Sequence, residues 1–209
     1  MEAGTARDPL RGETAAARAP AVQATADPAP LGLAAFALTT FVLSMINADL
    51  ISSKSEPIVF GLALTYGGLA QLLAGMWEFR AGNTFGATAF TSYGAFWLSF
   101  WAFDQFFAKD VPDAAVGHTV ALYLIAWGIF TTYMWIASLR TTVAISLVFI
   151  LLAATFFILG IGNANASSNV VKIGGWGGIA TAAAAWYASF AVVTNSTFGR
   201  TILPVKPLH

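Results

Sequence analysis

The sequence contains no cysteine and only two histidines, His118 and His209, among its 209 residues. The lack of cysteine excludes disulfides, thiolate metal sites and a cysteine nucleophile, and two histidines are too few for a histidine-rich metal site. The chain also offers no clustered pair of acids of the kind that enzymes use for acid–base chemistry. We therefore expect no metal, no cofactor and no enzymatic activity.

Charged residues are scarce as well. They make up 10% of the chain, whereas soluble proteins carry about 25%. Hydrophobic residues make up 57%, and the mean hydropathy is +0.71. A soluble fold could not cover its surface with so few charges, so a lipid bilayer is the solvent that fits this composition. The ten basic and ten acidic residues cancel, and no basic field indicates nucleic acid.

Six apolar stretches of about 20 residues are each long enough to cross a bilayer as a helix, and they lack the strict alternation of a β-barrel. No long apolar run precedes them, so we predict a disordered cytoplasmic tail at 1–26 rather than a cleaved signal. The sequence thus predicts an all-α integral membrane protein, with a six-helix transmembrane domain at 27–204 and a short C-terminal tail at 205–209. The predicted spans are 31–50, 58–79, 86–107, 117–139, 142–161 and 174–194.

The basic residues favour one orientation. Seven of the ten fall in the N-terminal tail, in alternate loops or after the last span, whereas Lys54, Lys109 and Lys172 fall in the other loops. Because lysine and arginine concentrate on the cytoplasmic side, this distribution predicts a multi-pass protein of the plasma or inner membrane with both termini in the cytoplasm.

Two spans carry small residues at helical spacing, which allows helix backbones to approach closely in lipid. We favour packing within one protomer over contacts between protomers. Glycines at 160–163 and 174–178 indicate either broken helices of a transport site or ordinary helix ends. The small residues of the second and sixth spans are Ala63, Gly67, Gly75, Gly174, Gly178 and Ala182.

The polar residues inside the spans are mostly uncharged. The acids Asp49, Glu78 and Asp104 fall near predicted span ends, where we expect contact with water or headgroups. Hydroxyls and amides donate hydrogen bonds without a fixed charge, and a path lined by them suits a small anionic or neutral solute that must also leave. Serine and threonine more often bond back to their own helix. The candidate path residues are Thr39, Thr40, Asn47, Tyr66, Gln71, Thr84, Thr88 and Asn163.

The first span opens on a helix-start signal. Asp27 is a good N-cap and Pro28 suits the first helical position. The free N–H groups of such a helix end favour an anion, although a helix start that only needs capping explains the pattern equally well.

Four stretches together resemble the SatP/YaaH acetate transporter family of bacteria and fungi. They are 27–33, 66–71, 82–97 and 198–204, and their order and spacing match the family as well. The run 82–97 is the most specific of the four. The chain departs from the family signature at its first position, where Asp27 stands in place of an asparagine. Both residues cap helices well, but a carboxylate at a pore mouth would repel an anion.

This resemblance implies six helices around a pore in each protomer and a homo-hexameric ring in the lipid. It implies transport of acetate, with succinate and other short carboxylates as further substrates, by a channel-like or proton-coupled mechanism. It also implies a hydrophobic girdle at the narrow point, formed by Phe36, Tyr93 and Leu152. The residues that match the family's helix-start signature are Asp27, Pro28, Pro30 and Gly32.

Such a girdle would close the pore by excluding water. The Tyr93 hydroxyl would then replace one of the hydrogen bonds that a carboxylate loses there, and a proton that entered with the solute would lower the cost of desolvation. The alternative function is a channel or exporter for ammonium, ammonia or another small neutral solute, since members of the family have been linked to ammonium export.

Overall fold

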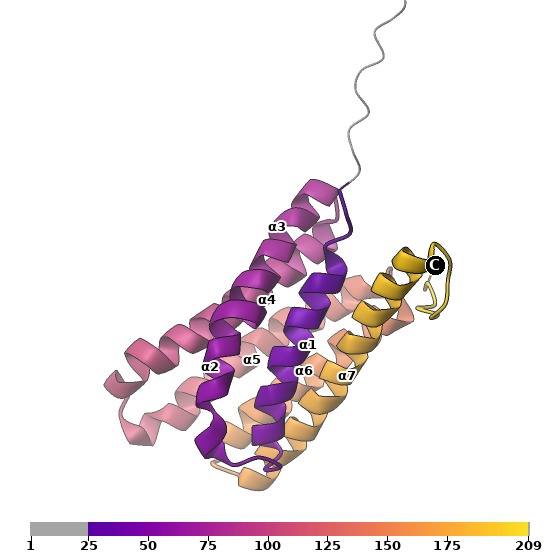
Figure 1. The fold of residues 1–209 in the computed structure, drawn as a ribbon. Coiled ribbons are helices and arrows are strands. Elements are labelled where there is room, and N and C mark those ends of the chain that lie inside the picture. The colour runs from indigo at the N-terminus through magenta and orange to yellow at the C-terminus, as the bar shows by residue number, and fades with distance from the viewer. Residues whose placement is uncertain (1–24, 209) are drawn as a thin grey trace, which may run out of the picture.

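The structure, a computed structural model, describes residues 25–208. The predicted tail at 1–26 and His209 therefore lie almost wholly outside the described residues. Within 25–208 the fold is all-helical, with no strand, and six long helical segments run side by side in a bundle (Figure 1). The segments are α1 (Ala29–Asn47), α2 with η2 and α3 (Pro57–Leu64, Thr65–Ala70 and Gln71–Ala81), α4 with η3 (Thr84–Ala102 and Phe103–Phe107), α5 (Asp113–Ser138), α6 (Val143–Ala164) and α7 (Ser168–Phe198).

Each segment overlaps most of one predicted span, so the six predicted helices are confirmed, although α1 ends three residues before the predicted end. Five stretches are long and apolar enough to cross a membrane among the described residues: Ala29–Asn47, Ser53–Ala81, Asp113–Ser138, Val143–Ala164 and Ser168–Phe198. The sixth segment, α4 with η3, falls short because many of its side chains are hydroxyl-bearing or aromatic. At about 1.5 Å per residue, its length still reaches roughly 35 Å, which exceeds the bilayer core of about 30 Å.

The turn between α3 and α4 shows why the sequence run that begins at residue 82 is so specific. Gly82 ends α3 in a left-handed conformation (φ 76°), which glycine adopts without a Cβ penalty. Asn83 then caps α4, and its Oδ1 accepts a hydrogen bond from the Gly86 backbone N–H at 3.1 Å. The two helices therefore reverse direction within two residues and pack closely against each other.

The small residues pack within the chain, as we favoured. A Cβ added to Gly67 would lie 2.6 Å from Thr39 Oγ1 of α1, and one added to Gly174 would lie 2.5 Å from Leu159 of α6. Gly178 likewise meets Ser44 of α1. The glycine-rich stretches break no helix, since α6 continues to Ala164 and α7 begins at Ser168.

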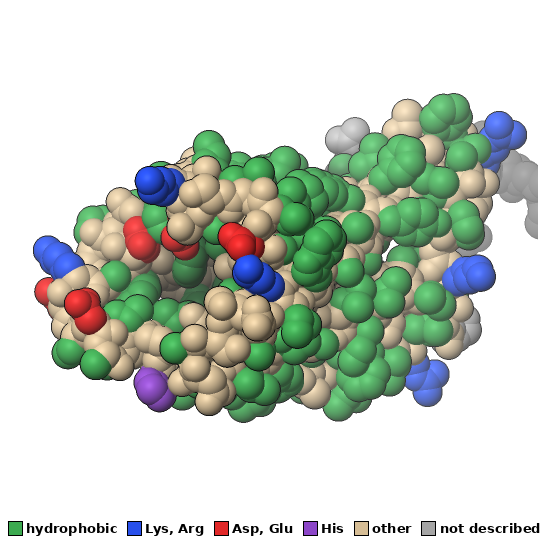
Figure 2. Space-filling view, turned by 90° about the horizontal axis from the view of Figure 1, so that it is seen from below, with side chains coloured by type: hydrophobic (Ala, Val, Ile, Leu, Met, Phe, Trp, Pro, Cys, Tyr) green, Lys and Arg blue, Asp and Glu red, His purple; other side chains and the backbone are tan. Residues whose placement is uncertain are grey.

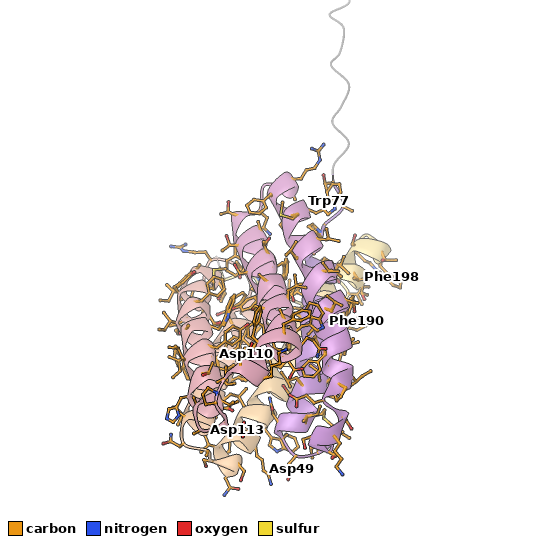
Figure 3. All side chains as sticks on the ribbon, turned by 90° about the vertical axis from the view of Figure 1, so that its left-hand side faces the viewer. Asp49, Trp77, Asp110, Asp113, Phe190 and Phe198 are labelled. Atoms are coloured by element: carbon orange, nitrogen blue, oxygen red, sulfur yellow. The ribbon has the colours of Figure 1, made fainter. Side chains whose placement is uncertain are left out.

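The two ends of the bundle differ in chemistry. The described chain begins and ends at one end of the bundle, which we call the termini end (Figure 1). Asp49, Asp110 and Asp113 lie at the opposite end, which we call the acidic end (Figure 3). Large apolar side chains are exposed on the outer surface, with Trp77 near the termini end and Phe190 further along the bundle each more than half exposed (Figure 3). Such a belt suits lipid or a neighbouring protomer.

The C-terminal tail is docked against the bundle. Residues 205–208 pair with the turn between α5 and α6, where the Val143 N–H donates to the Lys206 carbonyl at 2.9 Å and the Leu208 N–H donates to the Thr141 carbonyl at 3.1 Å. Before it, the side chain of Asn195 bonds the backbone of Ile202 and Leu203. The fourth family stretch therefore folds back on α7 and has a structural role.

The close contact between α1 and α7 gives a prediction about stability. A Cβ on Gly175 would lie 2.6 Å from the Asn47 carbonyl carbon, whereas one on Gly61 would meet nothing within 4 Å. We expect Gly175→Ala to lower the free energy of unfolding by about 1–3 kcal/mol through overpacking. Gly61→Ala should raise it by roughly 0.5–1 kcal/mol, because alanine favours a helix interior over glycine. Unfolding titrations in detergent micelles measure both, and equal effects would contradict the packing described here.

Candidate functional site

A cavity of about 380 Å³ opens between four helical segments at the acidic end. We call it the vestibule. Its walls are contributed by α1, by α4 with η3, by α5 and by α6, and most of the lining side chains are apolar. Among them are Leu43, Phe96, Phe100, Tyr123 and Leu159.

A second, more open hollow of about 610 Å³ adjoins the vestibule. Asn47, Glu56 and Asn163 line both, so the two hollows form one passage from the surface inward. The surface is visibly hollowed when the molecule is seen from the acidic end, and acidic side chains lie along part of its rim (Figure 2).

The rim of this passage carries a surplus of acids. Glu56 and Asp104 line the vestibule itself. Lys172 is the basic residue in the lining of the outer hollow, and its Nζ lies 2.7 Å from Asp49 Oδ2 in an ion pair. Both partners are substantially exposed, so water and salt screen the pair. The rim therefore presents net negative charge to solvent.

The vestibule face of α1 and α6 continues inward to two of the girdle candidates. Phe36 lies seven residues before Leu43 on α1, and Leu152 lies seven residues before Leu159 on α6. Seven residues are about two helical turns, so each pair shares a face and is separated by roughly 10 Å along the axis. Phe36 and Leu152 are 5% and 4% exposed.

The same relation holds on α4 and α5. Tyr93 lies one turn below Phe96, the innermost α4 residue of the vestibule, and Thr131 lies two turns below Leu124 of α5. Tyr93 is 3% exposed and Thr131 is fully buried. Four helices therefore contribute one buried residue each beneath the vestibule, and we call these four residues the collar: Phe36, Tyr93, Thr131 and Leu152.

Aromatic rings fill the collar around Tyr93. The ring centroids of Phe36 and Tyr93 are 5.8 Å apart, and Phe130 meets Tyr93 edge-on at 5.5 Å. Trp127 and Phe149 lie at 6.0 Å and 6.1 Å. These separations are those of favourable aromatic pairs. The rings of Phe36 and Tyr93 thus face inward, and the layer is both dry and apolar.

One hydrogen bond crosses the collar. Tyr93 Oη and Thr131 Oγ1 are 2.9 Å apart, and both side chains are buried. The sequence predicted no partner for Tyr93 and no contact of Thr131 with it. The seven-residue spacing from Leu124 to Thr131 places both on one face of α5. This spacing indicates a site role for Thr131 only once Leu124 is known to line the vestibule.

Two of the eight candidate path residues line the passage. Asn47 and Asn163 stand where the two hollows meet. Asn163 donates one amide hydrogen to the Leu159 carbonyl at 2.8 Å, which leaves its second amide hydrogen and its carbonyl oxygen available. The passage therefore offers amide donors at this point.

The four threonine candidates lie elsewhere. Thr39 is fully buried against Gly67 and donates to the Ala35 carbonyl at 3.0 Å, in the common back-bonding pattern. Thr40 is buried, and its hydroxyl has no partner among the described residues. Thr84 is exposed at the first turn of α4, and Thr88 is half-buried one turn further. None of them lines the vestibule, and a role in the path stays a prediction.

Tyr66 and Gln71 belong to an irregular part of the second span. Tyr66 is half-buried on η2, a π-helical turn, and Gln71 follows directly as the first residue of α3. The Gln71 side chain is fully buried, and neither its oxygen nor its nitrogen has a partner among the described residues. Because π-turns often occur at functional sites, both residues stay candidates.

The helix-start signature serves the packing of α1. The helix begins at Ala29, whose N–H donates to Asp27 Oδ1 at 2.9 Å, and Pro28 precedes it in helical conformation. The Pro30 carbonyl accepts a hydrogen bond from Ser189 Oγ of α7 at 2.7 Å. Gly32 faces the Phe90 ring of α4, where a Cβ would lie 2.6 Å away. These contacts fix α1 between α4 and α7.

The burial of Glu78 differs from our expectation. The side chain is only 1% exposed, although its position near a span end predicted contact with water or headgroups. Gly86 leaves space for it, because a Cβ there would lie 2.6 Å from both the Glu78 carboxyl carbon and Asn83 Nδ2. The missing side chain at Gly86 lets the turn between α3 and α4 cover the carboxyl group.

Within residues 25–208, no group of three or more His, Cys, Asp or Glu side chains could hold a metal ion. What the site offers is a passage with polar amides at its mouth, acids on its wall and a dry aromatic layer at its inner end.

Known proteins resemble this chain closely. Acetate permease A of Emericella nidulans is 45% identical over 195 residues, which cover 86% of this chain and 65% of that protein. The chain therefore spans just under two thirds of that fungal relative. The succinate-acetate/proton symporter SatP of Escherichia coli K12 is 38% identical over 184 residues, which cover 88% of this chain and 97% of the symporter.

The fold is shared with a solved structure. The structure of the bacterial acetate channel SatP matches with a TM-score of 0.81 and 38% identity, and the match covers 87% of this chain and 99% of that one. The chain is thus a multi-pass membrane protein, and residues 11–209 match the model of one family. This chain belongs to the GPR1/FUN34/yaaH family.

Proposed function

We propose that this protein carries acetate, and with it succinate or other short carboxylates, across the cell membrane. The observation that carries the proposal is the vestibule that ends on the collar, in a chain whose relatives are named as an acetate permease and a succinate-acetate/proton symporter. We propose transport rather than catalysis, since the passage holds no nucleophile–base pair.

The vestibule suits a hydrated solute. Its volume of about 380 Å³ would hold about a dozen water molecules at 30 Å³ each, far more space than one acetate needs. Asn47 and Asn163 offer amide donors at the mouth without a fixed positive charge, so a carboxylate is received there and is not trapped.

The collar is where water must leave. Phe36 and Leu152 are apolar, and the rings around Tyr93 exclude water from the layer. A constriction of this kind gates by dewetting. Its role as the pore constriction rests on the position of these residues beneath the vestibule.

We further propose that both termini face the cytoplasm and that the vestibule opens to the outside. Arg80, Arg140, Arg200 and Lys206 fall in the segments at the termini end, which supports this orientation. The apolar outer surface offers area both for lipid and for neighbouring copies in a homo-hexameric ring, as the family resemblance implies.

One observation favours a second candidate function. The acidic rim, with Glu56 and Asp104 on the vestibule wall, would attract a cation such as ammonium and repel an anion. Transport of ammonium or ammonia is therefore the alternative.

Uptake into liposomes that contain the purified protein separates the two functions. We expect uptake of radiolabelled acetate well above that of protein-free liposomes, with competition by succinate and none by ammonium. Ammonium uptake without protein-dependent acetate uptake would replace the first function by the second.

Truncation of the collar should widen the path. We expect Leu152→Ala to raise acetate flux several-fold and to admit bulkier monocarboxylates, because it removes three carbon atoms from the constriction. The matched control is Ile150→Ala on the same helix, where the side chain is 37% exposed on the outer surface. Equal flux and selectivity in the two variants, at equal expression, would show that Leu152 does not face the path.

Enlargement of the collar should have the opposite effect. We expect Phe36→Trp to reduce acetate flux at least tenfold, because a second ring fills the space that the solute must cross. Phe41→Trp is the control, since Phe41 packs on Trp186 of α7 at 5.1 Å and lies away from the vestibule. Unchanged flux in Phe36→Trp would place its ring in a helix contact only.

A further inference from the structure

The hydrogen bond across the collar has a determined direction. Thr131 Oγ1 lies 2.7 Å from the Trp127 carbonyl oxygen, to which it donates, and 2.9 Å from Tyr93 Oη. A hydroxyl group carries a single hydrogen. Since the hydrogen of Thr131 is committed to the Trp127 carbonyl, Tyr93 must donate its own hydrogen to Thr131.

This direction determines what Tyr93 can offer to a solute. With its hydrogen on Thr131, the phenolic oxygen presents only lone pairs, so it accepts hydrogen bonds and donates none. A protonated carboxylic acid has an O–H to donate to that oxygen. A carboxylate has only acceptors, and its approach would set lone pairs against lone pairs.

No charged side chain is among the rings packed on Tyr93, and their one hydrogen-bond donor, the indole N–H of Trp127, is directed at Tyr123. Four aromatic rings from α1, α5 and α6 pack on Tyr93 beside Thr131, and Tyr133 is the titratable side chain next along, beyond Phe130. The four rings are Phe36, Trp127, Phe130 and Phe149. Since the Tyr93 and Thr131 hydrogens are both committed within the protein and the Trp127 N–H is directed at Tyr123, a bare carboxylate would lose its hydration in the collar with little replacement.

The vestibule repeats this arrangement one layer further out. Tyr123 lines it and donates to the Phe96 carbonyl at 2.8 Å, so its phenolic hydrogen is also committed to the protein. Glu56 and Asp104 add negative charge to the same wall, and Lys172 at the rim is paired with Asp49. Donors that suit a carboxylate occur at the mouth, at Asn47 and Asn163, and are replaced by acceptors further in.

We propose that the collar passes the neutral carboxylic acid and rejects the carboxylate, and that Thr131 determines this choice by holding Tyr93 as a hydrogen-bond acceptor. The inference rests on the proposed function, since it names the chemical form of the solute. Thr131 acts through Tyr93 and is a positioning residue. Reversal of the pair, with Thr131 donating to Tyr93, would cost Thr131 its bond to Trp127 and leave a phenolic hydrogen in a dry layer, so the empty collar favours the direction described.

The test compares wild type with three variants in liposomes and planar bilayers, with radiolabelled acetate as the probe. Thr131→Val removes the acceptor at nearly the same volume and frees the Tyr93 hydrogen for a carboxylate. Thr131→Ser restores the acceptor. Thr132→Val is the matched control, because Thr132 donates to the Gly128 carbonyl at 2.8 Å in the same way but makes no hydrogen bond to Tyr93 within residues 25–208.

For wild type, Thr131→Ser and Thr132→Val, we expect protein-dependent flux without an acetate current. At fixed total acetate, this flux should fall about tenfold per unit of rising pH above the pKa of the acid, which is near 4.3, as for a glutamate side chain. Thr131→Val should show a flattened pH profile and an acetate current that reverses at the equilibrium potential of acetate.

Two results would overturn the inference while leaving acetate transport intact: an acetate current in wild type that accounts for its flux, or a folded Thr131→Val protein that keeps the wild-type pH profile. If Thr131→Val does not fold, the wild-type current alone decides. Absence of any protein-dependent acetate flux in wild type would overturn the proposed function and this inference together.

Discussion

The removal of water from a carboxyl group at one aromatic layer is the constraint on which the proposed pathway depends. The idealised cost of moving a carboxylate into a dry interior is about 20 kcal/mol, and several kcal/mol remain after relaxation. Protonation at pH 7 of an acid whose pKa is about 4.3 costs only about 3.7 kcal/mol. The buried collar holds no cationic side chain that could offset this cost. In the proposed pathway, the neutral acid therefore crosses it at a lower free-energy cost than the carboxylate.

The packing of the helices produces this layer. Glycines allow α1, α4 and α7 to approach closely, which turns the vestibule faces of α1, α4, α5 and α6 toward one another. Hydroxyl groups inside the bundle mostly donate to carbonyls of their own helix, as at Thr39, Thr131 and Thr181. Their hydrogens are thus committed to the protein, whereas the asparagines at the mouth keep free amide hydrogens.

The sequence predicted the helices well because a membrane span is a one-dimensional signal of length and hydropathy. The collar candidates Phe36, Tyr93 and Leu152 came from a family resemblance, and all three belong to one buried hydrophobic cluster, while their role as a constriction stays a prediction. Two features were out of reach. The burial of Glu78 depends on the absent side chain at Gly86 across a turn, and the pairing of Tyr93 with Thr131 depends on how α4 and α5 are rotated about their axes. Neither rotation nor cross-helix contact is encoded in periodicity alone.

The central claim is that the solute crosses the collar as the neutral acid. It is tested most directly by the ratio of protons to acetate molecules that enter protein-containing liposomes, measured with an internal pH dye and radiolabel after subtraction of the protein-free leak. The account predicts one proton per acetate at every membrane potential. Entry of acetate without acidification of the lumen, at a rate that follows the membrane potential, would contradict it.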